Sequence, residues 1–471
     1  TATVLSDSIR VGNDVFDSQF NVQLNLQKGG TAPVIDLASE WSVTDVSALT
    51  AYLPQKIIKP KLYSWFQSAM VAGSIPRGRT TLSGPLDKFP FDNDEGQFLI
   101  EASVRNLEFK YQPRWPAATQ ADMEIILDKT RLYSVQKRSV NAGNEAVDAT
   151  FENADLRDPI LRIEALSTGT LETIRSFSIQ SPINDMFGGK LEEVTVSGDA
   201  AFSLDLTVPL KNSKEFEFTT VIRSNNGTLA INGFKPPVLD LIGEVTISRG
   251  DISSQALGAT FLGQPISIAL ASSEEEQFSV VASAAGYVTA EAVVNDLGLP
   301  LDGLVRGGAD YEAQILFPRG RQQEPSPLTI RIDSDLAGMA FDLPAPAGKQ
   351  LDETLQIQGD IRFMPGGAGI ESSGFAENQT AWQLAFRRDE DEGALDFDRG
   401  VVTLGRDVME PAETRGLHIR GNTDTVRFED WLNLSRSGES ETGAADRIRS
   451  IDLTVANLYA IGQHLEGHKV R

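Results

Sequence analysis

Apolar and polar residues alternate with a period of two along much of the chain. The clearest run is Ala200–Val208, whose apolar members are Ala200, Phe202, Leu204, Leu206 and Val208. Successive side chains of a β-strand point to opposite faces of the sheet. The run therefore predicts a strand with one apolar face and one solvated face.

The same alternation recurs elsewhere, with turn-forming residues between the runs. Further strands are predicted at Phe98–Val104, Met123–Leu127, Leu328–Ile332, Leu355–Phe363 and Trp382–Phe386. Turns are predicted at Asp92–Gly96, Asn225–Gly227, Pro365–Gly367 and Asp389–Gly393. Such turns suit the reversal of antiparallel strands, so we expect a mainly β fold built of meanders.

Helical patterns are few. They cover Thr44–Tyr52, Lys61–Ala72 after Pro60, Thr170–Phe187 with an internal proline, and Glu429–Leu434. These helices are too sparse to cover the apolar faces of the predicted strands. Either a second sheet packs against those faces, or a curved sheet keeps a groove that ligand chains fill. The periodicity alone leaves both arrangements open.

The length of 471 residues predicts about three domain-sized units or one elongated domain. No fixed-period repeat is evident. Stretches rich in proline and glycine lie at Gly233–Pro237, Arg319–Pro327 and Leu343–Gly348. We expect three β-sheet segments, 1–190, 191–327 and 328–471, with helices near 44–72 and 170–187, which together could form one continuous elongated domain.

The net charge of the chain disfavours negatively charged binding partners. The chain has 42 Lys and Arg against 66 Asp and Glu, a formal net charge of −24. This charge repels nucleic acid and anionic lipid headgroups alike. There is no cysteine, and no apolar run of about 20 residues that could span a bilayer. Because Thr1 takes the place of an initiator Met and no signal sequence follows it, we expect a fragment whose targeting or anchoring segment lies outside the chain.

Candidate catalytic and metal-binding residues are scarce. The three histidines are His418, His464 and His468, too few to favour a relay. On a strand, His464, Glu466 and His468 would share one face at metal-ligand spacing, but the ligand set is incomplete, and a solvated strand end is the simpler interpretation. We predict no catalytic residue, no metal and no cofactor.

The acidic and aromatic clusters also have structural interpretations. Asp92 and Asp94 begin like a calcium loop, but Gln97 and Ser103 stand where that loop requires Gly and Glu. The runs Glu274–Glu276 and Asp389–Glu392 are interpreted as solvated turns rather than paired catalytic carboxylates. The aromatic residues Tyr52, Trp65, Tyr111 and Trp115 could bind a sugar or a headgroup, but a structural corner is favoured.

Three clusters carry a resemblance to a known family. The first comprises Tyr52–Gly73, then GPLDKFPF at Gly84–Phe91, and FKYQPRWPA at Phe109–Ala117. The second is IDSDLAGMAFDLPAPAGK at Ile332–Lys349, and the third runs from Arg399 to Trp431. They resemble the YhdP-type AsmA-like family, and the likeness corresponds to the middle of a longer protein.

This resemblance implies a location and a function. Family members are envelope proteins, anchored in the inner membrane and reaching across the periplasm with an apolar groove. The resemblance thus implies a periplasmic segment of a protein that moves phospholipid between membranes and shields the acyl chains. The residues expected to line the groove are Phe98, Ile100, Val104, Phe202, Leu204, Leu206, Ile330, Ile332, Phe363, Leu384 and Phe386. The alternative is a non-enzymatic structural or interaction module built as a β-sandwich.

Overall fold

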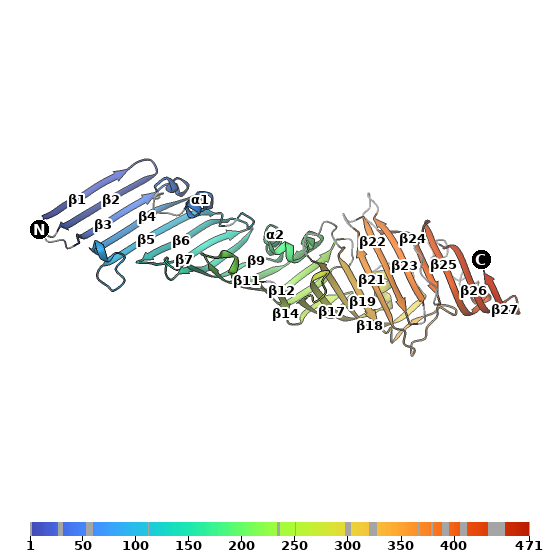
Figure 1. Cartoon of the computed structure of the whole chain (residues 1–471). Helices are drawn as coiled ribbons and strands as arrows, with labels where there is room; N and C mark the ends of the chain where they lie inside the picture. The colour runs from blue at the N-terminus through green and yellow to red at the C-terminus, as the bar shows by residue number, and fades with distance from the viewer. Residues whose placement is uncertain are drawn as a thin grey trace. The chain divides into compact units, whose positions relative to one another are not determined.

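A computed structural model shows a mainly β chain with a few short helices (Figure 1). It describes residues 2–26, 32–52, 60–111, 113–232, 236–249, 251–296, 303–319, 327–364, 368–377, 380–388, 395–405, 412–431 and 448–470. The fold class predicted from the alternation is confirmed. The residues group into two compact units. Unit 1 contains Thr1–Ile183, Gly198–Ser224 and Val245–Asp251, and unit 2 contains Asn184–Ser197, Asn225–Glu244 and Ile252–Arg471. The three sequence-based segments stay a prediction.

In unit 1, antiparallel strands pair in the order of the chain. They are β1 (Ala2–Gly12), β2 (Phe16–Leu26), β3 (Val34–Val43), β4 (Met70–Pro85), β5 (Gln97–Phe109), β6 (Ala118–Asp128), β7 (Arg131–Asn141), β8 (Asn144–Asn153), β9 (Ile160–Thr170) and β11 (Asp199–Pro209). Strand β11 pairs with β9 and with the first half of β12 (Glu217–Ile231). In Figure 1, strands β1 to β7 lie side by side as one layer.

Most strands of unit 2 also pair with a neighbour in sequence. They are β10 (Val194–Ser197), β13 (Val238–Ser248), β14 (Asp251–Ser254), β15 (Leu257–Phe261), β16 (Gln264–Ser272), β17 (Phe278–Thr289), β18 (Val305–Pro318), β19 (Thr329–Ser334), β20 (Met339–Phe341), β21 (Ile357–Phe363), β22 (Gly369–Ala376), β23 (Thr380–Arg388), β24 (Leu395–Leu404), β25 (Gly416–Arg427), β26 (Ile448–Ala460) and β27 (Gln463–Val470). Strands β12, β13 and β14 contribute residues to both units.

Two pairings near the carboxyl end differ from the predicted meander. Strand β24 pairs with β25 in parallel, and β25 pairs with β26 in parallel. Two parallel strands need a connection that returns the chain to the end of the sheet at which the first strand begins, and a hairpin turn cannot do this. The connections from Leu404 to Gly416 and from Arg427 to Ile448 are long enough for this return.

One predicted turn is wrong. The residues Asn225–Gly227 lie inside β12. This long strand pairs with β11 through Ser224 and with β10 from Thr228 onward. The polar, glycine-containing stretch therefore marks a change of partner strand along β12 rather than a chain reversal. The turn at Asp92–Gly96 joins β4 to β5 as predicted, whereas the turns predicted at Pro365–Gly367 and Asp389–Gly393 lie outside the described residues.

The helices are short. They are η1 (Val46–Tyr52), α1 (Pro60–Ala69), η2 (Leu86–Lys88), α2 (Leu171–Ile179), α3 (Ile183–Met186), η3 (Lys190–Glu193), η4 (Ser213–Glu215) and α4 (Ala290–Asn295). The helix predicted over Thr44–Tyr52 is a 3₁₀ helix, and the one predicted to Ala72 ends earlier because Met70 begins β4. Within the described ranges, none of these helices has the length and apolarity needed to cross a membrane.

Local chemistry explains the two helices near Thr170–Phe187. Thr170 caps α2, since its side chain accepts a hydrogen bond from the Thr173 backbone N–H and the Thr173 hydroxyl accepts one from the Thr170 backbone N–H. Pro182 then separates α2 from α3, as a proline that lacks an N–H is expected to do. The helix α4 was missed in the sequence, although Thr289 caps it by accepting from Ala292 N–H. The predicted helix Glu429–Leu434 lies partly outside the described residues.

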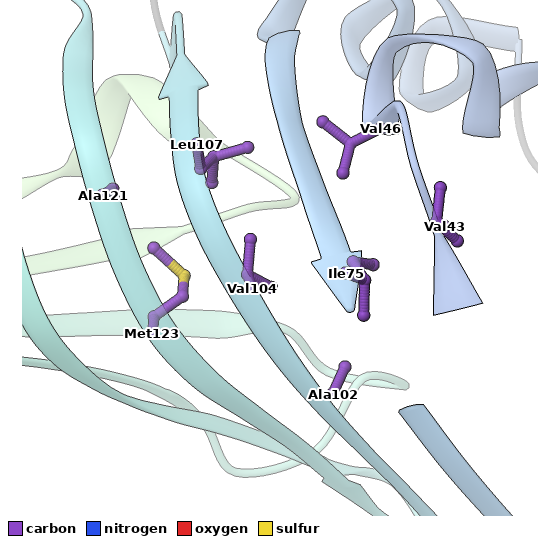
Figure 2. Close-up of a cluster of buried hydrophobic side chains, with 8 residues drawn as sticks. All are labelled: Val43, Val46, Ile75, Ala102, Val104, Leu107, Ala121 and Met123. Carbon is purple, nitrogen blue, oxygen red and sulfur yellow. The ribbon is translucent and has the colours of Figure 1, made fainter. Parts of the chain in front are cut away.

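The main buried cluster of unit 1 lies where η1 and α1 meet the sheet. Figure 2 shows its members, which are Val43, Val46, Ile75, Ala102, Val104, Leu107, Ala121 and Met123. Val46 of η1 is fully buried against strand residues. Trp65 of α1 adds an edge-on contact with Phe109 of β5 at 5.7 Å between ring centroids. The helices thus cover the end of the sheet at which β5 finishes.

Candidate functional site

Strand register places the apolar residues of unit 1 on one face. Directly paired residues point to the same side of a sheet. One row of paired residues crosses from β5 to β12 and consists of Ala102, Ile125, Ser134, Phe151, Ile163, Leu206 and Phe218. We call the side of the sheet that carries this row the apolar face of unit 1.

All the groove residues predicted in unit 1 share this face. Phe98, Ile100 and Val104 share it with Ala102 by the period of two along β5, and Phe202 and Leu204 share it with Leu206 along β11. Val104 is buried in the cluster under η1, while the other predicted residues are half-buried.

Helices cover only one of the two ends of this face. At the end where β5 finishes, η1 and α1 pack over the sheet. At the end where β5 begins, Phe98 and Ile100 stay half-buried, and Phe98 packs against Phe89. The Phe89 ring lies 5.0 Å from that of Phe98 and is 50% exposed. Phe89, Phe98 and Ile100 therefore form an apolar strip beside the covered end, and this strip remains partly open to solvent.

The opposite face of unit 1 is charged. The Glu124 carboxylate accepts hydrogen bonds from Ser103, from Arg105 at 2.8 Å and from Lys137 at 3.2 Å. Burial alone raises the pKa of Glu124, but these three donors outweigh it and lower the pKa to about 2. Arg131 pairs with Glu152 on the same face at 2.7 Å. The charged side chains thus pair with one another across strands.

Unit 2 has an apolar face of the same kind. One row of paired residues consists of Ala282, Ile315, Ile330, Ile361, Ser372, Leu384 and Gly400. The next row consists of Ala284, Ala313, Ile332, Gly359, Gly374, Trp382 and Val402. These rows define the apolar face of unit 2.

The groove residues predicted in unit 2 also fall on one face. Phe363 pairs with Ile370, which pairs with Phe386, in the row beside that of Ile330 and Leu384. Ile330 and Phe363 are buried, whereas Ile332, Leu384 and Phe386 are half-buried. The register therefore gathers the predicted residues of each unit on a single side.

The other face of unit 2 carries a buried carboxylate. Asp398, only 4% exposed, accepts from Arg387 at 3.0 Å, Arg399 at 3.2 Å and Arg415 at 2.9 Å. Burial alone raises the pKa of this carboxyl, but the arginines outweigh it and lower the pKa below its ordinary value. Arg331 bonds Asp360 across β19 and β21 at 3.4 Å. The polar face is held by such cross-strand pairs.

Two tryptophans lie flat on the apolar faces, and sequence reasoning did not single out either arrangement. Trp41 of β3 is paired with Gly78 of β4, and a Cβ at Gly78 would overlap its indole. Its Nε1–H donates to Thr80 Oγ1 at 3.0 Å. A tryptophan directly paired with a glycine is the feature that would have identified this arrangement, but the pairing can be recognised only once the strand register is known.

Trp382 repeats this arrangement in unit 2. It is paired with Gly374, and its ring covers Gly374 and reaches Gly359 on the next strand. Its Nε1–H donates to Ser372 Oγ at 3.2 Å. In both units the hydroxyl acceptor lies two residues from the paired glycine on the same strand. We call the two arrangements the Trp41 platform and the Trp382 platform.

The motifs that carried the family resemblance have structural roles. Ser334 Oγ donates to the Asp310 carbonyl and accepts from Leu336 N–H, and this turn ends at Gly338 with a φ of +83°. The buried Lys349 Nζ donates to the carbonyls of Met339 at 2.7 Å and Gln350 at 3.2 Å. These residues fix the loops around β20.

The four aromatic residues Tyr52, Trp65, Tyr111 and Trp115 have different packing partners. Trp65 Nε1–H donates to the Tyr111 carbonyl at 3.1 Å, and burial raises the pKa of the Tyr111 hydroxyl to about 12. Tyr52 instead packs against Phe16, and Trp115 packs against Phe177. These contacts are those of a structural corner.

The histidines and acidic clusters have contacts with neighbouring residues. The buried His418 places Nδ1 2.8 Å from Ser450 Oγ and Nε2 3.0 Å from Thr414 Oγ1. His464 stacks on Tyr459 within the β26–β27 hairpin. Asp92 pairs with Arg157 at 2.7 Å, and Asp94 pairs with Lys129. Across the described part of the chain, no three His, Asp or Glu residues gather as a metal site would require.

The fold and these faces define a class: mainly β proteins whose amphipathic sheets have one charged side and one apolar side. The chain belongs to the YhdP family, because the family model described as YhdP protein matches residues 2–471. The resemblance inferred from the sequence motifs is confirmed. No solved structure matches the chain significantly.

A curated relative gives this family a functional context. Over 448 residues the chain is 24% identical to the intermembrane phospholipid transporter YhdP of Escherichia coli (strain K12). The match covers 91% of this chain and 33% of that protein. The chain thus spans about a third of the length of this relative.

Proposed function

We propose that this chain is a segment of an intermembrane phospholipid transport protein and that its apolar faces shield acyl chains. The observation that carries the proposal is the half-buried state of Ile100, Leu204 and Leu384 on faces that register makes continuous within each unit. A protein ordinarily removes such residues from water. An aliphatic ligand would complete the burial.

The energetics favour acyl chains over headgroups as the bound part of the lipid. Each methylene removed from water contributes about 0.8 kcal/mol, so a single acyl chain supplies a large driving force. The net charge of −24 offers no attraction to an anionic headgroup. Transport would then be movement of lipid along an apolar surface, with no covalent step and no catalytic residue.

The proposed location is the periplasm, within a longer parent protein anchored in the inner membrane. Two observations support it. The relative from E. coli is named an intermembrane transporter, and the match covers 33% of it, which leaves about two thirds of that protein for other parts. The anchor and the protein partners at either membrane belong to the parent protein.

The second candidate is a non-enzymatic interaction module. The observation that favours it is the exposure of Val4 and Leu5 on β1, at 56% and 61%, since exposed apolar strand residues suit pairing with another protein. A closed sandwich would require a second sheet against the apolar faces. The half-buried residues on those faces favour the open, lipid-binding arrangement instead.

Native mass spectrometry of the chain purified from bacterial cells tests the proposal. We expect phospholipid to remain bound and to be recovered by organic extraction, because its acyl chains would cover the open apolar strip. A protein that stays free of lipid, even after incubation with phospholipid vesicles, would contradict lipid binding and favour the interaction module. A globular protein of similar size, purified in parallel, controls for adventitious lipid.

A further inference from the structure

The Trp41 and Trp382 platforms are matched features of two separate units. Each consists of a half-buried indole, a glycine directly across the strand pair, and a hydroxyl two residues from that glycine. Both lie on the apolar face of their unit. The two platforms are distant from each other in sequence, so the recurrence of the same three residue types indicates a shared physical requirement.

The glycines set the height of each indole above the sheet. A side chain on Gly78 or Gly374 would occupy the space that the indole fills. Without one, the ring lies against the backbone. The Trp41 ring also packs against the buried cluster of unit 1, and both rings remain half-buried, so part of each aromatic surface stays accessible. Aromatic rings supply large contact area with few rotatable bonds, so ordering a ligand against them costs little side-chain entropy.

The hydroxyls accept a hydrogen bond from the indole N–H, which is the only polar group of each ring. A tryptophan at a wet surface usually keeps its N–H in water while the ring faces an apolar phase. Here the N–H of Trp41 is bonded to Thr80, and that of Trp382 to Ser372. An aliphatic ligand could cover either ring without leaving a buried, unpaired donor, which is energetically costly.

We propose that the Trp41 and Trp382 platforms are two acyl-chain contact sites, one on each unit, and that an acyl chain bound to either unit lies against the indole of that unit. This inference rests on the proposed function and deepens it by naming where the acyl chains lie. The platforms recognise the methylene chain through flat contact area. Headgroup chemistry plays no part in this recognition.

Quenching of tryptophan fluorescence tests the sites. The chain has five tryptophans, so variants that keep only Trp41, only Trp382 or only Trp115 are made by Trp→Phe changes. Trp115 is the control, because its ring packs against Phe177 of α2 rather than over a strand glycine. Each variant is loaded with a phospholipid brominated in its acyl chains or with the unbrominated lipid, and bound lipid is counted by native mass spectrometry.

We expect the brominated lipid to remove a larger fraction of the emission from Trp41 and from Trp382 than from Trp115. Bound lipid with no greater loss at Trp41 and Trp382 than at Trp115 would overturn the two sites and leave the proposed function standing. An absence of bound lipid in the unaltered chain would instead overturn the proposed function. If the single-tryptophan variants do not fold, single Trp→Phe changes in the native background give the same comparison, because each removes the quenchable share of one ring.

Discussion

At the scale of single residues, glycine at two strand positions makes room for an indole. Glycine inside a strand ordinarily weakens it, because it has no side chain to pack. At Gly78 and Gly374 the ring of the paired tryptophan supplies the missing packing. The packing of the indole thus offsets the loss of strand stability caused by the glycine. No larger residue fits at either position, because its side chain would overlap the ring.

The change Gly374→Ala tests this requirement. The new Cβ would overlap the Trp382 ring and the Gln358 carbonyl, so we expect the free energy of unfolding to fall by about 1–3 kcal/mol, as for other overpacked sites. Urea denaturation followed by circular dichroism measures the change. The matched control is Gly258→Ala in β15, where a Cβ meets nothing within 4 Å. Equal effects of the two changes would argue against a packed platform.

Charged residues on the opposite face provide a pH-dependent contribution to stability. The folded-state pKa of Glu124 is about 2, below its ordinary value of 4.5, because donors from Ser103, Arg105 and Lys137 outweigh the effect of burial. A carboxyl with a lowered pKa stabilises the folded state above its ordinary pKa. That stabilisation is lost as the pH falls from about 4.5 toward about 2.

We therefore expect Glu124→Gln to lower stability near neutral pH by about 1–2 kcal/mol, a figure reduced for solvent screening. The difference between variant and unaltered chain should shrink as the pH is lowered through that window. Urea denaturation at a series of pH values measures it. Glu101→Gln, an exposed carboxylate on β5, serves as the control. A difference that stays constant with pH would show that the Glu124 contribution is not ionic.

At the scale of elements, period two along the sequence was sufficient to predict β5, β6, β11, β19, β21 and β23. Local alternation reflects one wet and one apolar face, and both faces exist here. The turn at Asn225–Gly227 was wrong because a strand can change partners without reversing, and partner choice is not encoded locally. The Trp41 platform could not be predicted for the same reason, since Trp41 and Gly78 meet only through register.

Strand β11 has one apolar and one polar face, which leads to a prediction about the face proposed to bind lipid. Leu204 is half-buried on the apolar face, so Leu204→Asp would place a charge where the acyl chains are proposed to lie. We expect retained folding but less bound phospholipid, measured by crosslinking to a photoactivatable lipid and by circular dichroism. The control Ala201→Asp adds the same charge to the opposite face, across from Arg223, and should leave lipid binding unchanged. Loss of folding in Leu204→Asp alone would indicate a sealed core.

At the scale of the whole molecule, net charge and apolar surface would act on different aspects of the proposed lipid uptake. The charge of −24 acts over the Debye length, whereas burial of acyl chains acts only at contact. The cross-strand ion pairs of Glu124 and of Arg331 lie on the face opposite the apolar rows of their units. The surface charge of a membrane should therefore decide how strongly it repels the approaching protein. Once a lipid is in contact with the apolar face, its acyl chains should decide the affinity.

This separation predicts how uptake depends on salt. With donor vesicles of zwitterionic lipid, transfer of a labelled phospholipid to the chain should change little between low and high salt. With vesicles rich in anionic lipid, transfer at low salt should be slower, because the Debye length is about 30 Å at 0.01 M and repulsion reaches the approaching protein. At 1 M salt the Debye length is about 3 Å, so the two rates should converge. Faster transfer from anionic vesicles at low salt would contradict the prediction and indicate a cationic docking surface, of which the arginines around Asp398 would be the first candidates to test by Arg415→Gln.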